Sequence, residues 1–188
     1  MTPSERAAAL RGEADELIEG LRLREHGAGI GDLIPTGSYF LDLMMWPDLD
    51  LYLPPSTADD LLALGRVLAR CECVKKLNFE KGGPGDLADG LYLSPVVQWG
   101  RWECPWKIDI WSLPLPIIEK KQAQLIDLKR RMTAAQRERI LDTKHKLLTP
   151  AGRTPMFSGI HIYRAIIDHG LMAHDEIVGY LKDNGIVV

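Results

Sequence analysis

The feature that most constrains the fold is a pair of aspartates separated by one leucine, Asp48-Leu49-Asp50, which continues as Leu51-Tyr52-Leu53. Successive side chains of a β-strand point to opposite faces, so the aspartates share one face and the leucines line the other. Their Cα atoms are then about 6.6 Å apart, and both carboxylates can reach the same cations. Because two close anions repel each other, the pattern indicates a positive partner, and Mg²⁺ is the usual one for oxygen ligands.

A glycine-serine pair, Gly37-Ser38, precedes the first aspartate by nine intervening residues. Gly37 can adopt a backbone conformation closed to other residues and lets a ligand approach the main chain. Ser38 is predicted to be the N-cap of a short helix over residues 39–45. Since free N–H groups at a helix N-terminus attract phosphate, the pair predicts a phosphate site beside the cation site.

Together these residues resemble the nucleotidyltransferase superfamily of the DNA polymerase beta type. That superfamily is marked by a Gly-Ser or Gly-Gly pair, a short spacer, and an acidic-apolar-acidic-apolar strand. Gly37-Ser38 and Asp48-Leu49-Asp50-Leu51 match this description. The superfamily also requires a third acidic residue between apolar neighbours on a later strand, which Ile108-Asp109-Ile110 provides.

The resemblance implies transfer of a nucleoside monophosphate from an NTP, with ATP as the expected donor, to a hydroxyl group, with release of pyrophosphate. It implies that Asp48, Asp50 and Asp109 are catalytic and hold two Mg²⁺ ions, which stabilise the attacking and leaving oxygens. Asp109 would lie on the nucleophile side and accept the acceptor's proton. Gly37 and Ser38 would bind the nucleotide phosphates. An alternative for Asp109 is a simple ion pair with Lys107.

The chain departs from the superfamily in its spacer, which lacks a basic residue and ends in Trp46-Pro47 where many members have Ser or Thr before the first aspartate. The positive partners of a triphosphate must therefore come from elsewhere, and the richest source is the segment 120–146. The favoured interpretation of this segment is solvated helix faces that interleave basic and acidic residues. A nucleic-acid surface is the alternative. The basic residues are Lys120, Lys121, Lys129, Arg130, Arg131, Arg137, Arg139, Lys144 and Lys146.

Four of the five tryptophans cluster around the segment that carries the third aspartate. Core packing and cross-strand pairing is the favoured interpretation of the group. Trp111 is the candidate for a substrate contact, because it lies two residues from Asp109 on the same face of a strand.

Apolar spacing predicts helices over 4–24, with Ser4 as N-cap, and over 58–69, 117–128, 134–147, 158–169 and 175–184, and strands over 32–36, 48–53, 73–79, 91–99 and 104–113. The expected fold is α+β: residues 1–113 form a mixed-sheet nucleotidyltransferase core with flanking helices, and residues 114–188 form a helical region packed on it. The glycine-rich stretch 81–86 is a loop, or alternatively a flap over the nucleotide.

The amino-acid composition limits the classes of partner and the cellular location that we expect. The 188 residues carry a net charge of −3, which favours neither nucleic acid nor a membrane. No apolar run is long enough to span a bilayer and the N-terminus lacks a signal peptide, so a cytoplasmic location is expected. Three cysteines, Cys71, Cys73 and Cys104, give neither a disulfide framework nor a zinc motif.

The mild acidity favours a small hydroxylated molecule as acceptor, as in the antibiotic-modifying branch of the superfamily. Two alternatives stay open. One is a catalytically silent nucleotide- or partner-binding module of an antitoxin-like kind, against which the three intact carboxylates argue. The other is a transferase that acts on tRNA or protein, which a basic surface leading to the cleft would favour.

Overall fold

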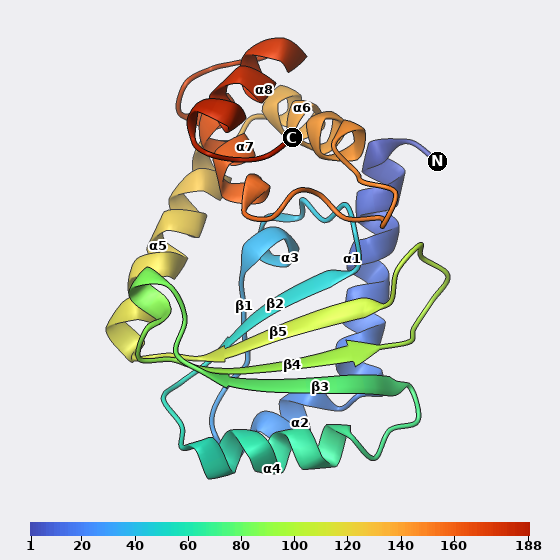
Figure 1. Ribbon diagram of the computed structural model, residues 1–188, viewed down its shortest axis with the longest axis vertical. Helices are drawn as coiled ribbons and strands as arrows, with labels where there is room; N and C mark the ends of the chain where they lie inside the picture. Colours follow the sequence, from blue (N-terminus) through green and yellow to red (C-terminus); the bar gives the residue numbers. More distant parts are fainter.

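A five-stranded mixed β-sheet lies at the centre of the computed structural model, which describes all 188 residues (Figure 1). The strand order is β1-β2-β5-β4-β3; β2 and β5 run parallel, and every other neighbouring pair is antiparallel. This arrangement confirms the predicted α+β fold with a mixed sheet. The strands are β1 (Ile34–Pro35), β2 (Asp48–Leu53), β3 (Val74–Lys81), β4 (Leu91–Val97) and β5 (Trp106–Ser112).

The helices follow the predicted order with shifted ends. They are α1 (Pro3–Gly20), α2 (Leu23–Gly27), α3 (Gly37–Leu41), α4 (Ala58–Leu68), α5 (Leu115–Arg131), α6 (Ala134–Lys146), α7 (Ser158–Ile167) and α8 (His174–Asp183), with one 3₁₀ turn, Gly85–Leu87. The first predicted helix is split, because Arg22 adopts a left-handed conformation with φ of 50°. The helix predicted over 39–45 instead spans α3, and Asp42 ends it with φ of 58°.

Helix capping explains two of these ends. Thr57 caps α4 as a capping box with Asp60, which matches the predicted start of that helix. The prediction of Ser4 as the N-cap of the first helix is wrong. Thr2 has that role, in a capping box with Glu5, because Pro3 fits the first helical position where no N–H is needed.

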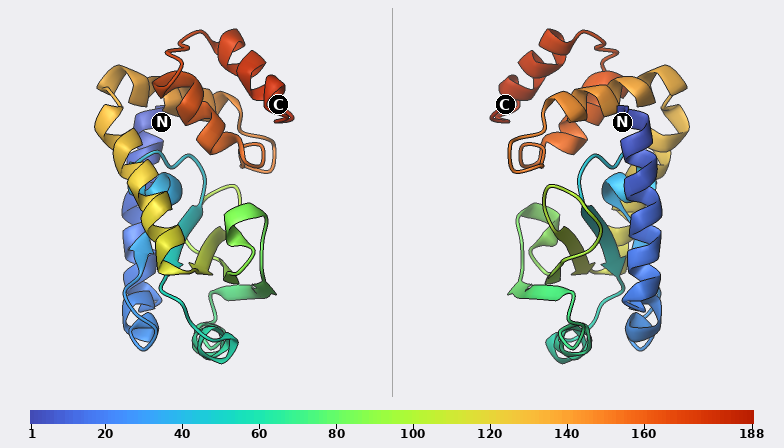
Figure 2. Two further views of the ribbon diagram at one scale, coloured as in Figure 1. Left: turned by 90° about the vertical axis from the view of Figure 1, so that its left-hand side faces the viewer. Right: turned by 90° about the vertical axis from the view of Figure 1, so that its right-hand side faces the viewer.

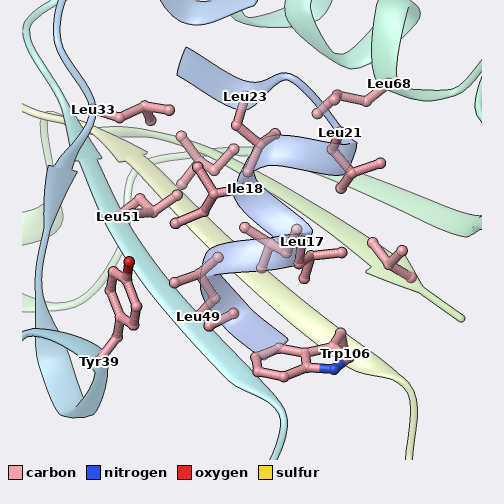
Figure 3. Packing of buried hydrophobic residues seen from close by; sticks show 14 of the residues in the cluster. Leu17, Ile18, Leu21, Leu23, Leu33, Tyr39, Leu49, Leu51, Leu68 and Trp106 are labelled. Carbon is pink, nitrogen blue, oxygen red and sulfur yellow. The ribbon is translucent and has the colours of Figure 1, made fainter. Parts of the chain in front are cut away.

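The main core lies on the sheet face opposite the aspartates. Leu49 and Leu51 of β2 lie there beside α1 (Figure 3). Ile108 and Ile110 of β5 are buried in the same core, to which α4 also contributes. Alternation along both strands sends every second side chain into this core. The residues between them therefore face the other side of the sheet, where the charged side chains lie.

A second apolar cluster joins the C-terminal helices to the rest of the chain. Leu41, the last residue of α3, and Leu43 and Met45 from the segment between α3 and β2 are buried in it beside residues of α6, α7 and α8. Figure 2 shows these C-terminal helices gathered at the end of the molecule opposite α4. This packing explains why the spacer lacks the polar residues of the superfamily pattern. We keep the predicted division after residue 113 as a proposal.

Two connections of the sheet lie on either side of β4. The strands predicted over 91–99 and 104–113 are both shorter at the ends that face each other, since β4 ends at Val97 and β5 begins at Trp106, so their connection is longer than predicted. The glycine-rich loop after β3 contains the 3₁₀ turn and reaches α5, where Asp86 pairs with Lys120 at 3.0 Å. No helix has the length and apolar character needed to cross a bilayer.

Candidate metal and nucleotide site

The three predicted carboxylates lie on one face of two neighbouring strands. In the parallel pairing of β2 with β5, Asp50 stands opposite Asp109, and Asp48 stands opposite Lys107. On this face, β2 presents the partly exposed Asp48 and Asp50, and β5 presents Lys107, Asp109 and Trp111. The leucines and isoleucines between them are buried on the other face. A single strand pairing therefore brings side by side Asp50 and Asp109, which are about sixty positions apart in the sequence.

Asp48 and Asp50 lack a positive partner. Neither carboxylate takes part in a hydrogen bond or ion pair with another residue, and Asp48 Oδ1 is shielded from solvent without any partner. Burial, followed by the negative charges of Asp50 and Asp109, raises the pKa of Asp48 well above its ordinary value. Burial and the charge of Asp109 likewise raise the pKa of Asp50 to about 6. Such oxygen donors fit a hard divalent cation, which would relieve this repulsion.

The environment of Asp109 differs, because both of its carboxylate oxygens accept hydrogen bonds. Tyr92 donates its hydroxyl to Oδ1 at 2.6 Å, and Ser94 donates to the same oxygen at 3.1 Å. The Lys107 ammonium donates to Oδ2 at 2.7 Å, so the ion pair considered as an alternative from the sequence is present. Burial and the hydrogen bond to Asp109 raise the pKa of Tyr92 to about 12. No group of three or more His, Cys, Asp or Glu side chains is arranged to hold a metal ion.

Gly37 is in contact with the second aspartate, and no other residue would fit there. Its φ is 58°, and a Cβ added to it would overlap Asp50 Oδ2. The preceding Thr36 N–H donates to the Asp50 carbonyl at 3.1 Å, which fixes the bend against β2. The predicted cap is wrong by two residues: Thr36, not Ser38, stands at the N-cap of α3, because the helix already begins at Gly37.

Gly37→Ala should therefore reduce both stability and ligand binding. A left-handed conformation costs a non-glycine residue about 1–2 kcal/mol, and the overlap with Asp50 adds to that cost. Chemical denaturation should show this loss relative to Gly29→Ala, since Gly29 is exposed outside any helix and a Cβ there meets nothing within 4 Å. Equal stability of the two variants would show that the bend is not held against Asp50.

An open pocket of about 420 Å³ adjoins Asp50. Gly37, Trp111 and Lys121 are among its lining residues, and Leu87 contributes a wall from the glycine-rich loop. The Trp111 ring lies 4.6 Å, between centroids, from the ring of Tyr92. The predicted substrate residue is thus both a cross-strand neighbour and a pocket wall. The complete lining is Thr36, Gly37, Asp50, Tyr52, Leu87, Trp111, Lys121, Gln124, Leu125, Phe157, Gly159 and Ile160.

Lys144, one of the nine basic residues that the sequence analysis named without distinguishing among them, lies close to the aspartates. This lysine of α6 is only 3% exposed, and its ammonium donates to the Leu43 carbonyl at 2.5 Å and the Tyr163 hydroxyl at 3.2 Å. Burial lowers its pKa to about 8, although the charges of Asp48 and Asp50 act in the opposite direction. One signal could have found it: Lys144 follows Ile140 by four residues and so lies on the apolar stripe of its helix.

Most of the other basic residues of the segment 120–146 are paired with acids, as the favoured interpretation expected. Arg130 and Arg131 pair with Asp127, and Arg139 and Lys146 pair with Asp142. Arg137 contacts Asp42 in the same way. Exposed pairs of this kind contribute little stability, but they leave few free cations on the helix faces.

Comparison with known proteins identifies the fold. No protein-family model matches the chain, and no curated protein is similar to it. Solved structures do match: a cytoplasmic RNA terminal U-transferase has a TM-score of 0.55 at 15% identity, over 83% of this chain and 46% of that chain. Cid1 with the UTP analog UMPNPP has a TM-score of 0.52 at 13% identity, over 74% of this chain and 41% of that one.

The chain has the nucleotidyltransferase fold. A further structure, of the Cid1 poly(U) polymerase, gives a TM-score of 0.54 at 14% identity. The chain covers less than half the length of each of these three matching chains. The resemblance drawn from the sequence is thereby confirmed at the level of the fold.

Proposed function

We propose that the chain is a Mg²⁺-dependent nucleotidyltransferase that moves a nucleoside monophosphate from an NTP to a hydroxyl group and releases pyrophosphate. One observation carries the proposal. Within a nucleotidyltransferase fold, the half-buried Asp48 and Asp50 have no side-chain partner, Asp48 Oδ1 is shielded from solvent, and Asp50 lies between Asp109 and the bend at Gly37. Unpaired buried carboxylates are costly, so their retention is explained by a cation that binds them.

Each residue then has a definite role. Asp48 and Asp50 hold the divalent cation, which when bound offsets the charge of the triphosphate and of the leaving pyrophosphate. Asp109 lies beside Asp50 and orients the acceptor hydroxyl, whose proton it accepts. Gly37 and Ser38 provide main-chain contacts to the phosphates.

The positive partner of the triphosphate and the surface for its base come from the pocket wall. Lys121 lines the pocket and makes a long ion pair of 3.9 Å with Asp86, which Lys120 contacts more closely at 3.0 Å, so a phosphate in the pocket can compete for the Lys121 ammonium. Trp111 offers an aromatic surface on the same side of Asp50.

A small hydroxylated molecule is the proposed acceptor, because the basic side chains of α5 and α6 are largely paired with acids and the net charge is −3. RNA is the second candidate, and the solved structures favour it. Their titles describe RNA terminal uridylyl transferase activity and a bound ApU product. Two further titles name UTP or a UTP analog. ATP, the expected donor, is therefore tested beside the three other NTPs. The cytoplasmic location stays a prediction.

The test is incubation with each α-labelled NTP and Mg²⁺, in the presence of either a panel of hydroxylated small molecules or an RNA with a free 3′ hydroxyl. We expect label to appear in one acceptor class and pyrophosphate to be released, with no transfer after EDTA treatment. Label in RNA would replace the small-molecule acceptor and keep the reaction. Nucleotide binding without transfer to any acceptor would support a silent binding module, and absence of both would reject the proposal.

A further inference from the structure

The three aspartates of the site differ in how far their charge is already satisfied. Asp48 and Asp50 make no hydrogen bond or ion pair, whereas Asp109 accepts from Tyr92, Ser94 and Lys107. A metal ion at Asp109 Oδ2 would compete with the Lys107 ammonium, which donates to that oxygen at 2.7 Å. Asp48 and Asp50 are therefore better placed than Asp109 to bind a cation.

Lys107 is well placed to satisfy more than one of these carboxylates. It stands opposite Asp48 in the strand register, and its ammonium reaches Asp109 two residues along its own strand. Its main-chain N–H donates to the Pro47 carbonyl at 3.0 Å, and its Nζ lies 6.0 Å from the centroid of the Tyr92 ring. With a side chain that is 30% exposed, the lysine is held at the edge of the site by its strand neighbours.

We propose that the Lys107 ammonium takes the place of the second cation, so that the site binds a single divalent cation between Asp48 and Asp50. This inference rests on the proposed use of these carboxylates as metal ligands, and it replaces the two ions expected from the sequence. The contacts support it, because Tyr92, Ser94 and Lys107 already donate to both oxygens of Asp109, whereas the oxygens of Asp48 and Asp50 accept from no side chain. Unlike a metal ion, the ammonium is covalently fixed and remains in place between turnovers.

The test counts bound metal rather than product. Mn²⁺ is titrated into the full chain with a non-hydrolysable NTP analogue, and bound Mn²⁺ is measured by electron paramagnetic resonance. We expect one Mn²⁺ per chain in the wild type and in Lys107→Arg, and two in Lys107→Met, which keeps the apolar stem and removes the charge. Lys75→Ala is the matched control, since Lys75 is an exposed lysine that donates only to the Glu72 carbonyl. It should also bind one.

Two Mn²⁺ ions in the wild type, or one in Lys107→Met, would overturn the single-ion site and leave the proposed function standing. No bound Mn²⁺ in any variant would overturn both. If Lys107→Met fails to fold, the wild-type and Lys107→Arg counts still decide, because two ions in either contradict the inference. As a second measurement, saturating Mn²⁺ should raise the melting temperature of Lys107→Met more than that of the wild type.

Discussion

Asp50→Asn should abolish nucleotidyl transfer, with turnover reduced by about 1,000-fold or more, while the fold stays intact. The amide is a weaker ligand for a hard cation than the carboxylate, so the charge of the triphosphate is no longer offset. Asp50 adjoins both Gly37 and Asp109, so the change removes the carboxylate that lies between the predicted phosphate site and the third aspartate. The measurement is label transfer from the preferred NTP at saturating Mg²⁺.

The same substitution should make the metal-free protein more stable. Asp50 has no partner and is repelled by Asp109, so an uncharged side chain of the same size removes an unfavourable charge from a buried position. Glu16→Gln is the control, since Glu16 is exposed in the middle of α1, which packs on the opposite face of the sheet, and it should change neither activity nor stability. Full Mg²⁺-dependent activity in Asp50→Asn would reject the assignment of Asp50 as a ligand.

Without metal, the protein should lose stability as the pH rises from about 4 to about 7. Burial and Asp109 raise the pKa of Asp50 to about 6, above its value of 3.8 in an unfolded chain. Between these two values the folded state binds more protons than the unfolded state, so unfolding becomes easier as the pH increases. A shift of this size corresponds to about 3 kcal/mol, and the raised pKa of Asp48 acts in the same direction.

Chemical denaturation in EDTA at pH 5 and pH 7 measures this effect. Asp50→Asn should lose less stability than the wild type over this interval, because its side chain does not titrate. Adding Mg²⁺ at pH 7 should restore stability to the wild type and leave Asp50→Asn nearly unchanged. An identical pH response in the two proteins would show that Asp50 is not a buried unpaired carboxyl.

Local signals predicted the parts of the fold that local interactions determine. The strand that carries Asp48 and Asp50 was predicted with both ends correct, because its alternating leucines have only one buried face to occupy. The start of α4 was predicted because Thr57 and Asp60 form a capping box within one turn. The segment after Gly37 was mispredicted, since Leu43 and Met45 are buried by helices that follow a hundred residues later.

The site residues also fall into two groups, those that a local motif predicts and those that depend on tertiary packing. The carboxylates and Gly37 belong to a short motif and could be identified from residue type and spacing. Tyr92 and Ser94 reach Asp109 from a neighbouring strand, so their roles depend on a strand order that no local pattern encodes. The apolar stripe of α6 could indicate that Lys144 is buried, but only helix packing determines what it contacts. The pairing of Lys107 with Asp109 was foreseeable as an alternative, because residues two apart on a strand share a face.

The most direct test of the account is to locate the cation. Crystals grown at pH 7 with Mn²⁺ and a non-hydrolysable NTP analogue would be measured for anomalous scattering. The account predicts a Mn²⁺ peak within ligand distance of both Asp48 and Asp50, with the triphosphate completing its coordination in the pocket beside Gly37. Bound nucleotide with no metal at these two carboxylates, or metal at another place in the chain, would contradict it.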